Sequence, residues 1–215
     1  MDFLAITLSL LDGLKTSILL FAVVIVASLP IAFLITFGAR CKYKPINFIF
    51  NAFIYIIRGT PLLLQLLFIF FGLPNLPFIG KYMVFERFTA AIIGFTLNYA
   101  AYFAEIFRGG LLSIDKGQYE AAQVLGLNKI QTFIKVILPQ MLKVSLPSIT
   151  NESITLIKDT SLLYAVSVPE ILHYAKVSVN RTSDPSIFLI AGAIYLIINS
   201  LLTLVFKKIE KKLEF

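Results

Sequence analysis

The chain has 215 residues, of which 58% are hydrophobic and 14% are charged. This composition is far more apolar than that of an average soluble domain and indicates a polytopic membrane protein. The net charge of +7 does not indicate nucleic-acid binding, because the basic residues stand at the ends of apolar runs and form no basic face. Their placement fits the excess of Lys and Arg found on cytoplasmic loops.

The residue inventory excludes two kinds of covalent or metal chemistry. The single cysteine, Cys41, cannot form an internal disulfide, and with the single histidine, His173, it cannot build a zinc site, so no metal site is expected. The N-terminal residues lack a basic region and a small-residue cleavage site. We therefore interpret the first apolar run as a retained span, preceded by a short interfacial segment over residues 1–14.

The first span is expected over residues 16–39, which carry no charge and are long enough to cross a bilayer. A basic cluster follows, formed by Arg40, Lys42 and Lys44. This cluster predicts a cytoplasmic loop and hence an N-terminus outside. Residues 46–57 are too short to span alone and are expected to form an interfacial or buried helix.

The second span is expected to begin near Arg58. Thr60 followed by Pro61 is typical of a helix start, with threonine as N-cap and proline at the first helical position. The helix is then expected to continue across the membrane over residues 62–71. Glycines and prolines follow and predict an outer loop.

The third span is expected over residues 88–107. Ala90, Gly94 and Asn98 recur at four-residue steps, an arrangement that lets helices approach closely in lipid. Tyr102 and Glu105 continue the face of Asn98 at helical spacing, so a polar stripe is expected to descend towards the inner surface.

Residues 117–140 form a polar interruption and predict two short helices. Residues 119–125 are rich in alanine, Gly126 stands where a left-handed C-cap would end the first helix, and Asn128 can cap the second. One apolar face is expected in the second helix, formed by Ile130, Phe133, Ile134, Ile137 and Leu138. Pro139 is expected to kink or end it.

The fourth span is expected to begin near Leu142 and to carry a polar face formed by Ser148, Glu152, Thr155 and Asp159. The Asp-Thr-Ser run at residues 159–161 indicates a broken helix. Residues 163–185 are expected to form an outer segment, and residues 187–206 the fifth span, whose following lysines place the C-terminus inside. The chain is thus predicted to be all-α, with about five spans in a single domain, residues 1–215.

A resemblance rests on the spacing within the polar interruption. The run Glu120-Ala121-Ala122, three residues, Gly126, nine residues and then residues 136–139, Val-Ile-Leu-Pro, resembles the "EAA" coupling loop of ABC-importer permeases. Val136 is a conservative departure from the isoleucine of that pattern. Three further stretches are similar to those of the polar amino acid subfamily, namely Arg58-Gly59-Thr60-Pro61, residues 104–110 and residues 158–162.

The resemblance implies the type I importer fold and a coupling loop that docks on a separate ATPase through Glu120, Ala121, Ala122, Gly126, Leu138 and Pro139. It also implies a second permease copy or paralogue, an extracytoplasmic amino-acid-binding protein and location in a bacterial inner membrane. The sequence contains no phosphate-binding loop, so ATP and Mg²⁺ are expected on the partner ATPase, with no cofactor on this chain. A nucleophile–base pair is also lacking, which argues against an intramembrane enzyme.

Ionisable groups inside a membrane must face a cavity, a partner or each other. The candidates for substrate binding are Asn98, Tyr102, Glu152, Thr155 and Asp159, and those for a gating or structural role are Arg58, Glu105, Arg108 and Lys158. For Arg58 a lipid phosphate is an alternative partner. The excess of carboxylates favours a cationic amino acid as substrate. A secondary transporter that uses the membrane carboxylates as a proton relay is an alternative, although it leaves the coupling-loop spacing unexplained.

Overall fold

The computed structural model describes residues 3–213, and within this range the chain forms helices and no strands. The α-helices, in chain order, are α1 (Phe3–Ala39), α2 (Lys44–Gly59), α3 (Leu62–Leu67), α4 (Arg87–Leu112), α5 (Lys116–Val124), α6 (Lys129–Thr132), α7 (Leu138–Asp159), α8 (Ile171–Thr182) and α9 (Ile187–Leu213). The expected all-α fold is confirmed.

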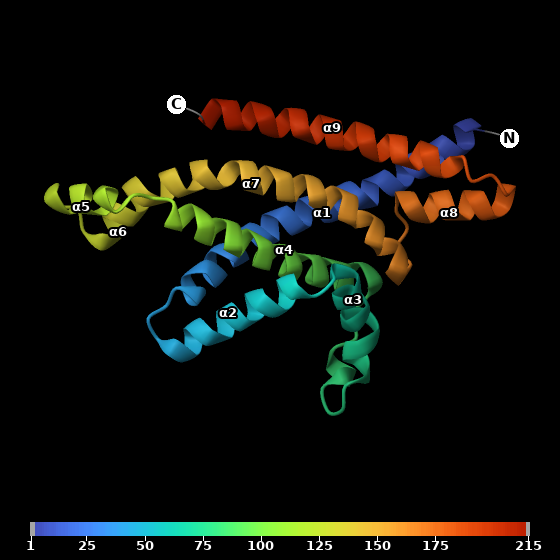
Figure 1. Ribbon diagram of the computed structural model, residues 1–215. Helices are drawn as coiled ribbons and strands as arrows, with labels where there is room; N and C mark the ends of the chain where they lie inside the picture. Colours follow the sequence, from blue (N-terminus) through green and yellow to red (C-terminus); the bar gives the residue numbers. More distant parts are fainter. Residues whose placement is uncertain (1–2, 214–215) are drawn as a thin grey trace.

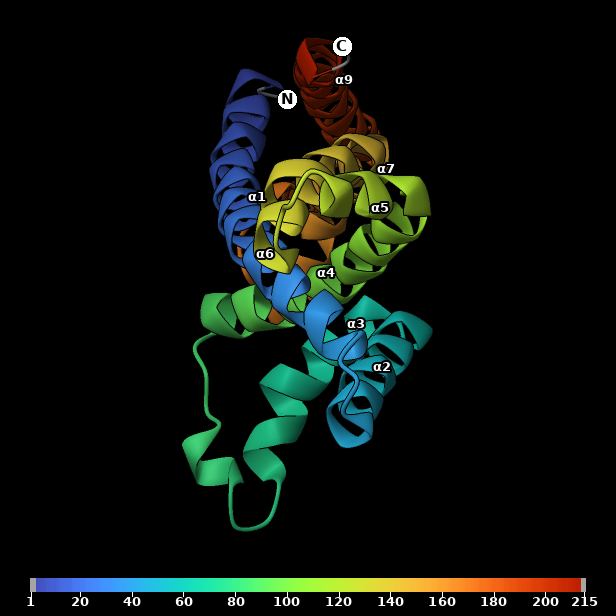
Figure 2. The same ribbon diagram turned by 90° about the vertical axis from the view of Figure 1, so that its left-hand side faces the viewer.

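The helices are consistent with about five membrane crossings. Helices α1, α4 and α9 are each long and apolar enough to span a membrane, and α2 with the segment Leu62–Asn75 forms a bent pair that can serve as one further span. Helix α7 has 22 residues but is less apolar, because it carries Glu152, Lys158 and Asp159. It runs beside α4 through the middle of the bundle, as Figures 1 and 2 show, and its 22 residues are long enough for a fifth crossing.

Helix α4 forms the centre of the main apolar core and packs against α1, α2, α3 and α7. Its small-residue face is buried as expected, with Ala90 fully covered. A side chain at Gly94 would bring its Cβ to 3.3 Å from Ile69 Cδ1, which shows how closely the segment after α2 lies over this face. The small residues thus allow the polar positions that follow on α4 to approach a neighbouring element.

The N-terminal prediction is wrong for the described part of residues 1–14. Helix α1 already begins at Phe3, and Ile6 and Leu10 are buried in a second, smaller apolar cluster with α8 and α9. The tertiary partners of this segment are distant in sequence, which explains why it resembles a surface segment when read alone. Met1 and Asp2 lie outside the described residues.

The break before Leu62 is present, but the predicted capping roles of Thr60 and Pro61 are wrong. Helix α2 lies against α1 and α4 from Lys44 onwards, and the chain bends by 107° between α2 and α3. Thr60 does not cap α3: its hydroxyl donates to the Ile56 carbonyl at 2.8 Å, and extended Pro61 is the N-cap residue. A residue before proline avoids the helical region, so the bend occurs here.

The fourth span begins earlier than expected, because α6, a π-helical turn (Phe133–Ile137) and α7 follow one another without a break. Pro139 therefore does not end the helix; it follows directly after the π-turn Phe133–Ile137, where the regular pattern of hydrogen bonds has already changed. The π-turn also rotates the apolar face, so that Ile137 is buried whereas Ile130 and Ile134 are exposed.

The expected break after Asp159 is present. Helix α7 ends there, and the 3-10 helix Thr160–Val166 leads to Ser167, which has a left-handed backbone with φ of 56°. The outer segment contains the 12-residue helix α8. Helix α8 and the start of α1 lie at one end of the bundle, whereas α5, α6 and the last turns of α9 lie at the other (Figure 1).

Candidate functional site

A cavity of about 510 Å³ lies where α3, α4 and α7 meet. All five residues predicted to bind substrate line it, namely Asn98, Tyr102, Glu152, Thr155 and Asp159, together with Thr60, Pro61, Leu62, Leu63, Tyr99 and Leu162. Helical spacing explains this convergence, because positions 98, 99 and 102 share the side of α4 that faces the polar stripe of α7. The cavity brings together residues from four parts of the chain.

The best-defined polar contact in the cavity joins α4 to the end of α7. The hydroxyl of Tyr99 donates to Asp159 Oδ2 at 2.7 Å. Tyr99 is 1% exposed, whereas Glu152 and Asp159 are half-buried and retain oxygens that face the cavity. The wall therefore presents two carboxylates, one of them oriented by a buried phenol.

Asn98 is held by a residue that the sequence reading did not select. Its Nδ2 donates to Gln65 Oε1 at 2.9 Å, and Gln65 Nε2 in turn donates to the Ile57 carbonyl at 2.8 Å and to Thr60 Oγ1 at 2.7 Å. Gln65 thereby fastens the α2–α3 bend to α4 and fixes the orientation of the Asn98 amide beside the cavity. The i, i+4 patterning of α4 could not reveal this partner, which lies 33 residues away in sequence.

The predicted gating residues Arg58, Glu105 and Arg108 form one cluster at the inner side of the cavity. The Arg108 guanidinium donates to both carboxylate oxygens of Glu105, and Arg58 Nη1 lies 3.7 Å from Glu105 Oε1. The Arg58 guanidinium carbon also lies 5.2 Å from the centre of the Tyr102 ring. Tyr102 lines both the cavity and a second hollow of about 580 Å³ next to Arg58, so its ring separates the two.

Lys158 behaves differently from the other candidates. Lys158 is exposed and does not line the cavity, although it precedes Asp159 in sequence. Thr155, by contrast, does line the cavity, and its hydroxyl donates to the Asn151 carbonyl at 3.2 Å. Lys158 thus lies outside the cavity lining, although its charge interacts with that of Asp159.

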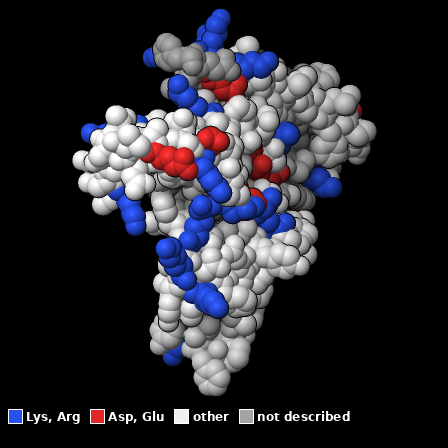
Figure 3. Space-filling view, turned by 60° about the vertical axis from the view of Figure 1, so that its left-hand side comes forward, with Lys and Arg blue, Asp and Glu red and all other residues white. Residues whose placement is uncertain are grey.

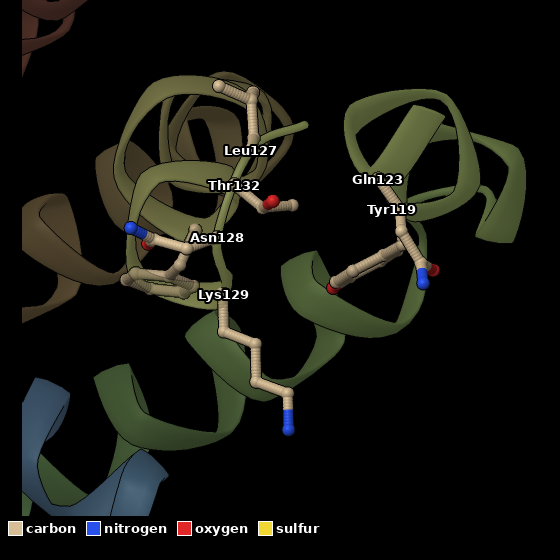
Figure 4. A pocket seen from close by; sticks show the side chains of 7 residues that line it. Tyr119, Gln123, Leu127, Asn128, Lys129 and Thr132 are labelled. Atoms are coloured by element: carbon tan, nitrogen blue, oxygen red, sulfur yellow. The ribbon is translucent and has the colours of Figure 1, made fainter. Parts of the chain in front are cut away.

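The polar interruption forms a helical hairpin at one end of the bundle. Gly126 has φ of +74°, as a left-handed cap requires, and Asn128 and Gln131 form a capping box at the start of α6. Glu120 and Ala121 are exposed, Ala122 is buried, and Leu138 packs on the main core. Figure 4 shows Tyr119 of α5 and Thr132 of α6 facing each other across a cavity of about 670 Å³.

The hairpin continues directly into the helix that carries the cavity residues. From Lys129 to Asp159 the chain is helical without interruption, which corresponds to a rod roughly 45 Å long at about 1.5 Å per residue. This rod crosses α4 at Gly110, where an added Cβ would lie 2.2 Å from Ser145 Oγ and 3.1 Å from the Met141 carbonyl oxygen. The hairpin helix α6 and the cavity residues Glu152 and Asp159 therefore belong to one continuous helical segment, which includes the π-turn and Pro147.

Replacing Gly110 by Ala is expected to destabilise the α4–α7 crossing and lower the melting temperature in detergent, because Ser145 and Met141 must shift. Gly109→Ala is the matched control: its Cβ would meet nothing within 4 Å, so the gain in helix propensity of up to ~1 kcal/mol should maintain or raise stability. Adding Ser145→Ala to Gly110→Ala should restore part of the loss. Equal melting temperatures for the Gly110→Ala and Gly109→Ala variants would contradict the close crossing.

Most of the chain matches the model of a known protein family. Residues 28–215 match the family described as "Binding-protein-dependent transport system inner membrane component". The chain belongs to this family. It is accordingly a multi-pass membrane permease component of a transport system rather than an enzyme.

Curated relatives and solved structures agree with this family. The chain is 41% identical to the L-cystine transport system permease protein TcyB of Bacillus subtilis, over 84% of this chain and 76% of that one. It is 34% identical to the arginine ABC transporter permease protein ArtM of Escherichia coli, over 94% of this chain and 93% of that one.

A crystal structure of an amino acid ABC transporter with histidines superposes with a TM-score of 0.88, at 29% identity and 99% coverage of both chains. The MetNI methionine ABC transporter in an inward-facing form superposes with a TM-score of 0.73 at 18% identity and shares the fold. The type I importer permease fold expected from the resemblance is thereby confirmed.

Proposed function

We propose that this permease chain forms the translocation path of an ATP-driven importer of polar amino acids, with a preference for cationic ones. The observation that carries the proposal is the cavity between α3, α4 and α7, whose titratable lining among the described residues consists of two carboxylates and two tyrosines. A carboxylate pair attracts an ammonium or guanidinium group, and polar side chains inside a membrane mark the substrate path. The relatives named for arginine and cystine are consistent with this substrate class.

Within the cavity, Asp159 and Glu152 accept hydrogen bonds from the cationic groups of the substrate. Asn98 and Thr155 face the substrate's carboxylate, and Tyr102 closes the inner side. Arg58, Glu105 and Arg108 form the inner gate: Arg58 lies over the ring of Tyr102, and Glu105 pairs with both arginines. Lys158 has a structural role outside the cavity.

The hairpin of α5 and α6 is proposed to dock on a separate ATPase dimer, which binds ATP and Mg²⁺; this chain carries no cofactor of its own. Large apolar side chains are exposed at its tip, with Val124 at 88%, Leu125 at 77% and Ile130 at 71%. Such a group outside the membrane favours a protein partner. Closure of the ATPases would then move residues 117–140 and, through the continuous helix, tilt α7 against α4.

Two further partners complete the proposed assembly. The cavity lining is only half-buried at Tyr102, Glu152 and Thr155, so a second copy or a paralogue is proposed to close the path. An extracytoplasmic amino-acid-binding protein would deliver substrate at the opposite end, beside α8. We treat residues 1–215 as one transmembrane domain.

The orientation follows from the distribution of charge. Figure 3 shows Lys and Arg side chains spread over the face turned towards the hairpin end, and Arg40 and Lys42 lie between α1 and α2, with Lys44 at the start of α2. An excess of basic residues favours the cytoplasmic side. We therefore place α5, α6 and the C-terminal turns of α9 in the cytoplasm and the N-terminus outside, in a bacterial inner membrane.

The test is uptake of radiolabelled arginine by proteoliposomes that contain this permease with its ATPase and binding protein. We expect uptake to require ATP, to survive uncouplers, and to be inhibited more strongly by lysine or histidine than by glutamate. More effective competition by glutamate than by lysine would remove the cationic preference. Uncoupler-sensitive uptake without ATP would instead support ion-coupled transport.

Replacing Arg58 by Gln is expected to loosen the inner gate. The variant loses the cation over Tyr102 and one partner of Glu105, contacts that together contribute roughly 1–2 kcal/mol at partly exposed sites. Efflux of preloaded arginine without ATP should rise roughly 5- to 30-fold, at 1.4 kcal/mol for each factor of ten. Lys158→Gln removes a cation outside the cavity and serves as control; equal leakage from both variants would contradict the gate.

A further inference from the structure

A buried carboxylate at the outer end of the bundle has no role in the cavity itself. Glu170 precedes α8 and is completely inaccessible to solvent. Its Oε2 accepts from the backbone N–H of Leu172 at 2.8 Å, and its Oε1 accepts from that of His173 at 2.6 Å. These two bonds cap the N-terminus of α8, as an acidic N-cap residue does.

Glu170 has a third partner that capping does not require. The hydroxyl of Tyr195, on α9, donates to Glu170 Oε2 at 3.0 Å. Three residues separate Glu170 from the end of the 3-10 helix Thr160–Val166, which packs against α1 and α8. The pair of Glu170 and Tyr195 therefore ties the segment that follows the break of α7 to α9.

Helix α1 lies against Glu170 from the remaining side. A Cβ added at Gly13 would lie 2.5 Å from the carbonyl carbon of Glu170, so the backbones are in direct contact there. The pair therefore joins the smaller apolar group of α1, α8 and α9 to the main core, to which Leu163 and Val166 of the 3-10 helix belong.

The 3-10 helix Thr160–Val166 is thus held at both ends. At its start Tyr99 binds the carboxylate of Asp159, the residue before the 3-10 helix, and after its end Tyr195 joins Glu170 and the start of α8 to α9. A buried carboxylate that loses a hydrogen-bond donor is left partly unsatisfied, which destabilises the packed conformation that buries it. Loss of the Tyr195 hydroxyl should therefore loosen the segment that carries Asp159.

We propose that Tyr195 and Glu170 form a latch that fixes the 3-10 helix after α7 and so positions the Asp159 carboxylate in the cavity wall. Both are positioning residues that do not touch the substrate. The inference rests on the proposed role of Asp159 in substrate binding, but the latch itself is independent of which substrate is carried.

Two variants separate the latch from simple capping. Tyr195→Phe removes the hydroxyl and retains the ring. Glu170→Asp retains a carboxylate able to cap α8, while its shorter side chain no longer reaches Tyr195. Tyr164→Phe is the matched control, because Tyr164 lies in the same 3-10 helix and its hydroxyl has no hydrogen bond within the described part of the chain.

The first measurement is hydrogen exchange of backbone amides in the assembled permease–ATPase complex. Tyr195→Phe and Glu170→Asp should each accelerate exchange over residues 160–168, with exchange in α4 and membrane abundance unchanged, whereas Tyr164→Phe should match the wild type. Wild-type exchange in both latch variants would overturn the proposal, whatever substrate the transporter carries.

The second measurement is arginine uptake in proteoliposomes. The latch variants should raise the arginine concentration for half-maximal uptake roughly fivefold, with a nearly unchanged maximal rate, because the loss of one partner of a buried group amounts to about 1 kcal/mol. Accelerated exchange with an unaltered half-saturation would refute the positioning role. If the wild type takes up no arginine although the latch variants exchange faster, the proposed substrate class fails and the latch remains.

Discussion

Replacement of Asp159 by Asn is expected to raise the arginine concentration for half-maximal uptake roughly 10- to 100-fold, because a hydrogen bond to a charged group contributes about 1.5–3 kcal/mol. Asparagine has nearly the same shape, so Tyr99 can still donate to its carbonyl oxygen. The change therefore removes the charge and retains the packing of α4 against α7. The measurement is the concentration dependence of ATP-driven uptake in proteoliposomes.

Two other changes calibrate this result. Lys158→Gln alters the preceding residue, which is exposed and does not line the cavity, and because it removes a cation near Asp159 it should not weaken arginine binding. Tyr99→Phe removes the donor to Asp159 but leaves the carboxylate, so its effect should be severalfold and smaller than that of Asp159→Asn. If Asp159→Asn transported arginine with wild-type half-saturation, the cavity would not be the site that selects the cation.

Gly126→Val is expected to uncouple ATP hydrolysis from transport. Gly126 has φ of +74°, and an added side chain would meet nothing within 4 Å, so the strain comes from the backbone alone. A left-handed conformation penalises L-residues by roughly 1–2 kcal/mol, and more for a β-branched one, enough to shift the hairpin to another geometry in most molecules. Uptake should fall about tenfold at equal membrane abundance.

Gly126→Asn tests whether conformation is the cause, because asparagine tolerates the left-handed region. It should associate with the ATPase and transport much as the wild type does. A second change at the hairpin, Glu120→Lys, reverses an exposed charge and should also weaken ATPase association. Normal transport and normal ATPase association in both Gly126→Val and Glu120→Lys would show that the hairpin does not couple the two subunits.

Local signals explain which parts of the fold could be predicted. The cap at Gly126, the capping box at Asn128 and the break after Asp159 depend on neighbouring residues, and each is present. The errors concern tertiary contacts. The first turns of α1 are helical because α8 and α9 cover them, and the π-turn before α7 rotates the apolar face in a way that a 3.6-residue period does not describe.

The candidate site shows the same division. Helical spacing placed Asn98 and Tyr102 on one face of α4, and Glu152, Thr155 and Asp159 on one face of α7. It could not show that residues 60–63 complete the cavity wall, because their position depends on the bend between α2 and α3, which turns them towards α4. Gln65 and Glu170 were missed for a related reason: their partners lie on other helices. A polar residue within an apolar run was the available signal for Gln65.

Protection of an introduced cysteine measures occupancy of the cavity itself. Cys41 is the one cysteine of the chain, so Cys41→Ser gives a background for two variants. Thr155→Cys lies in the cavity wall, and Asn151→Cys lies one turn earlier on α7, exposed and outside the cavity lining. If arginine occupies this cavity in the assembled transporter, saturating arginine should slow the reaction of a cationic thiol reagent at position 155 about tenfold or more. The reaction at position 151 should be unaffected. Equal labelling rates at position 155 with and without arginine, in a transporter that still takes arginine up, would contradict the assignment of this cavity as the substrate site.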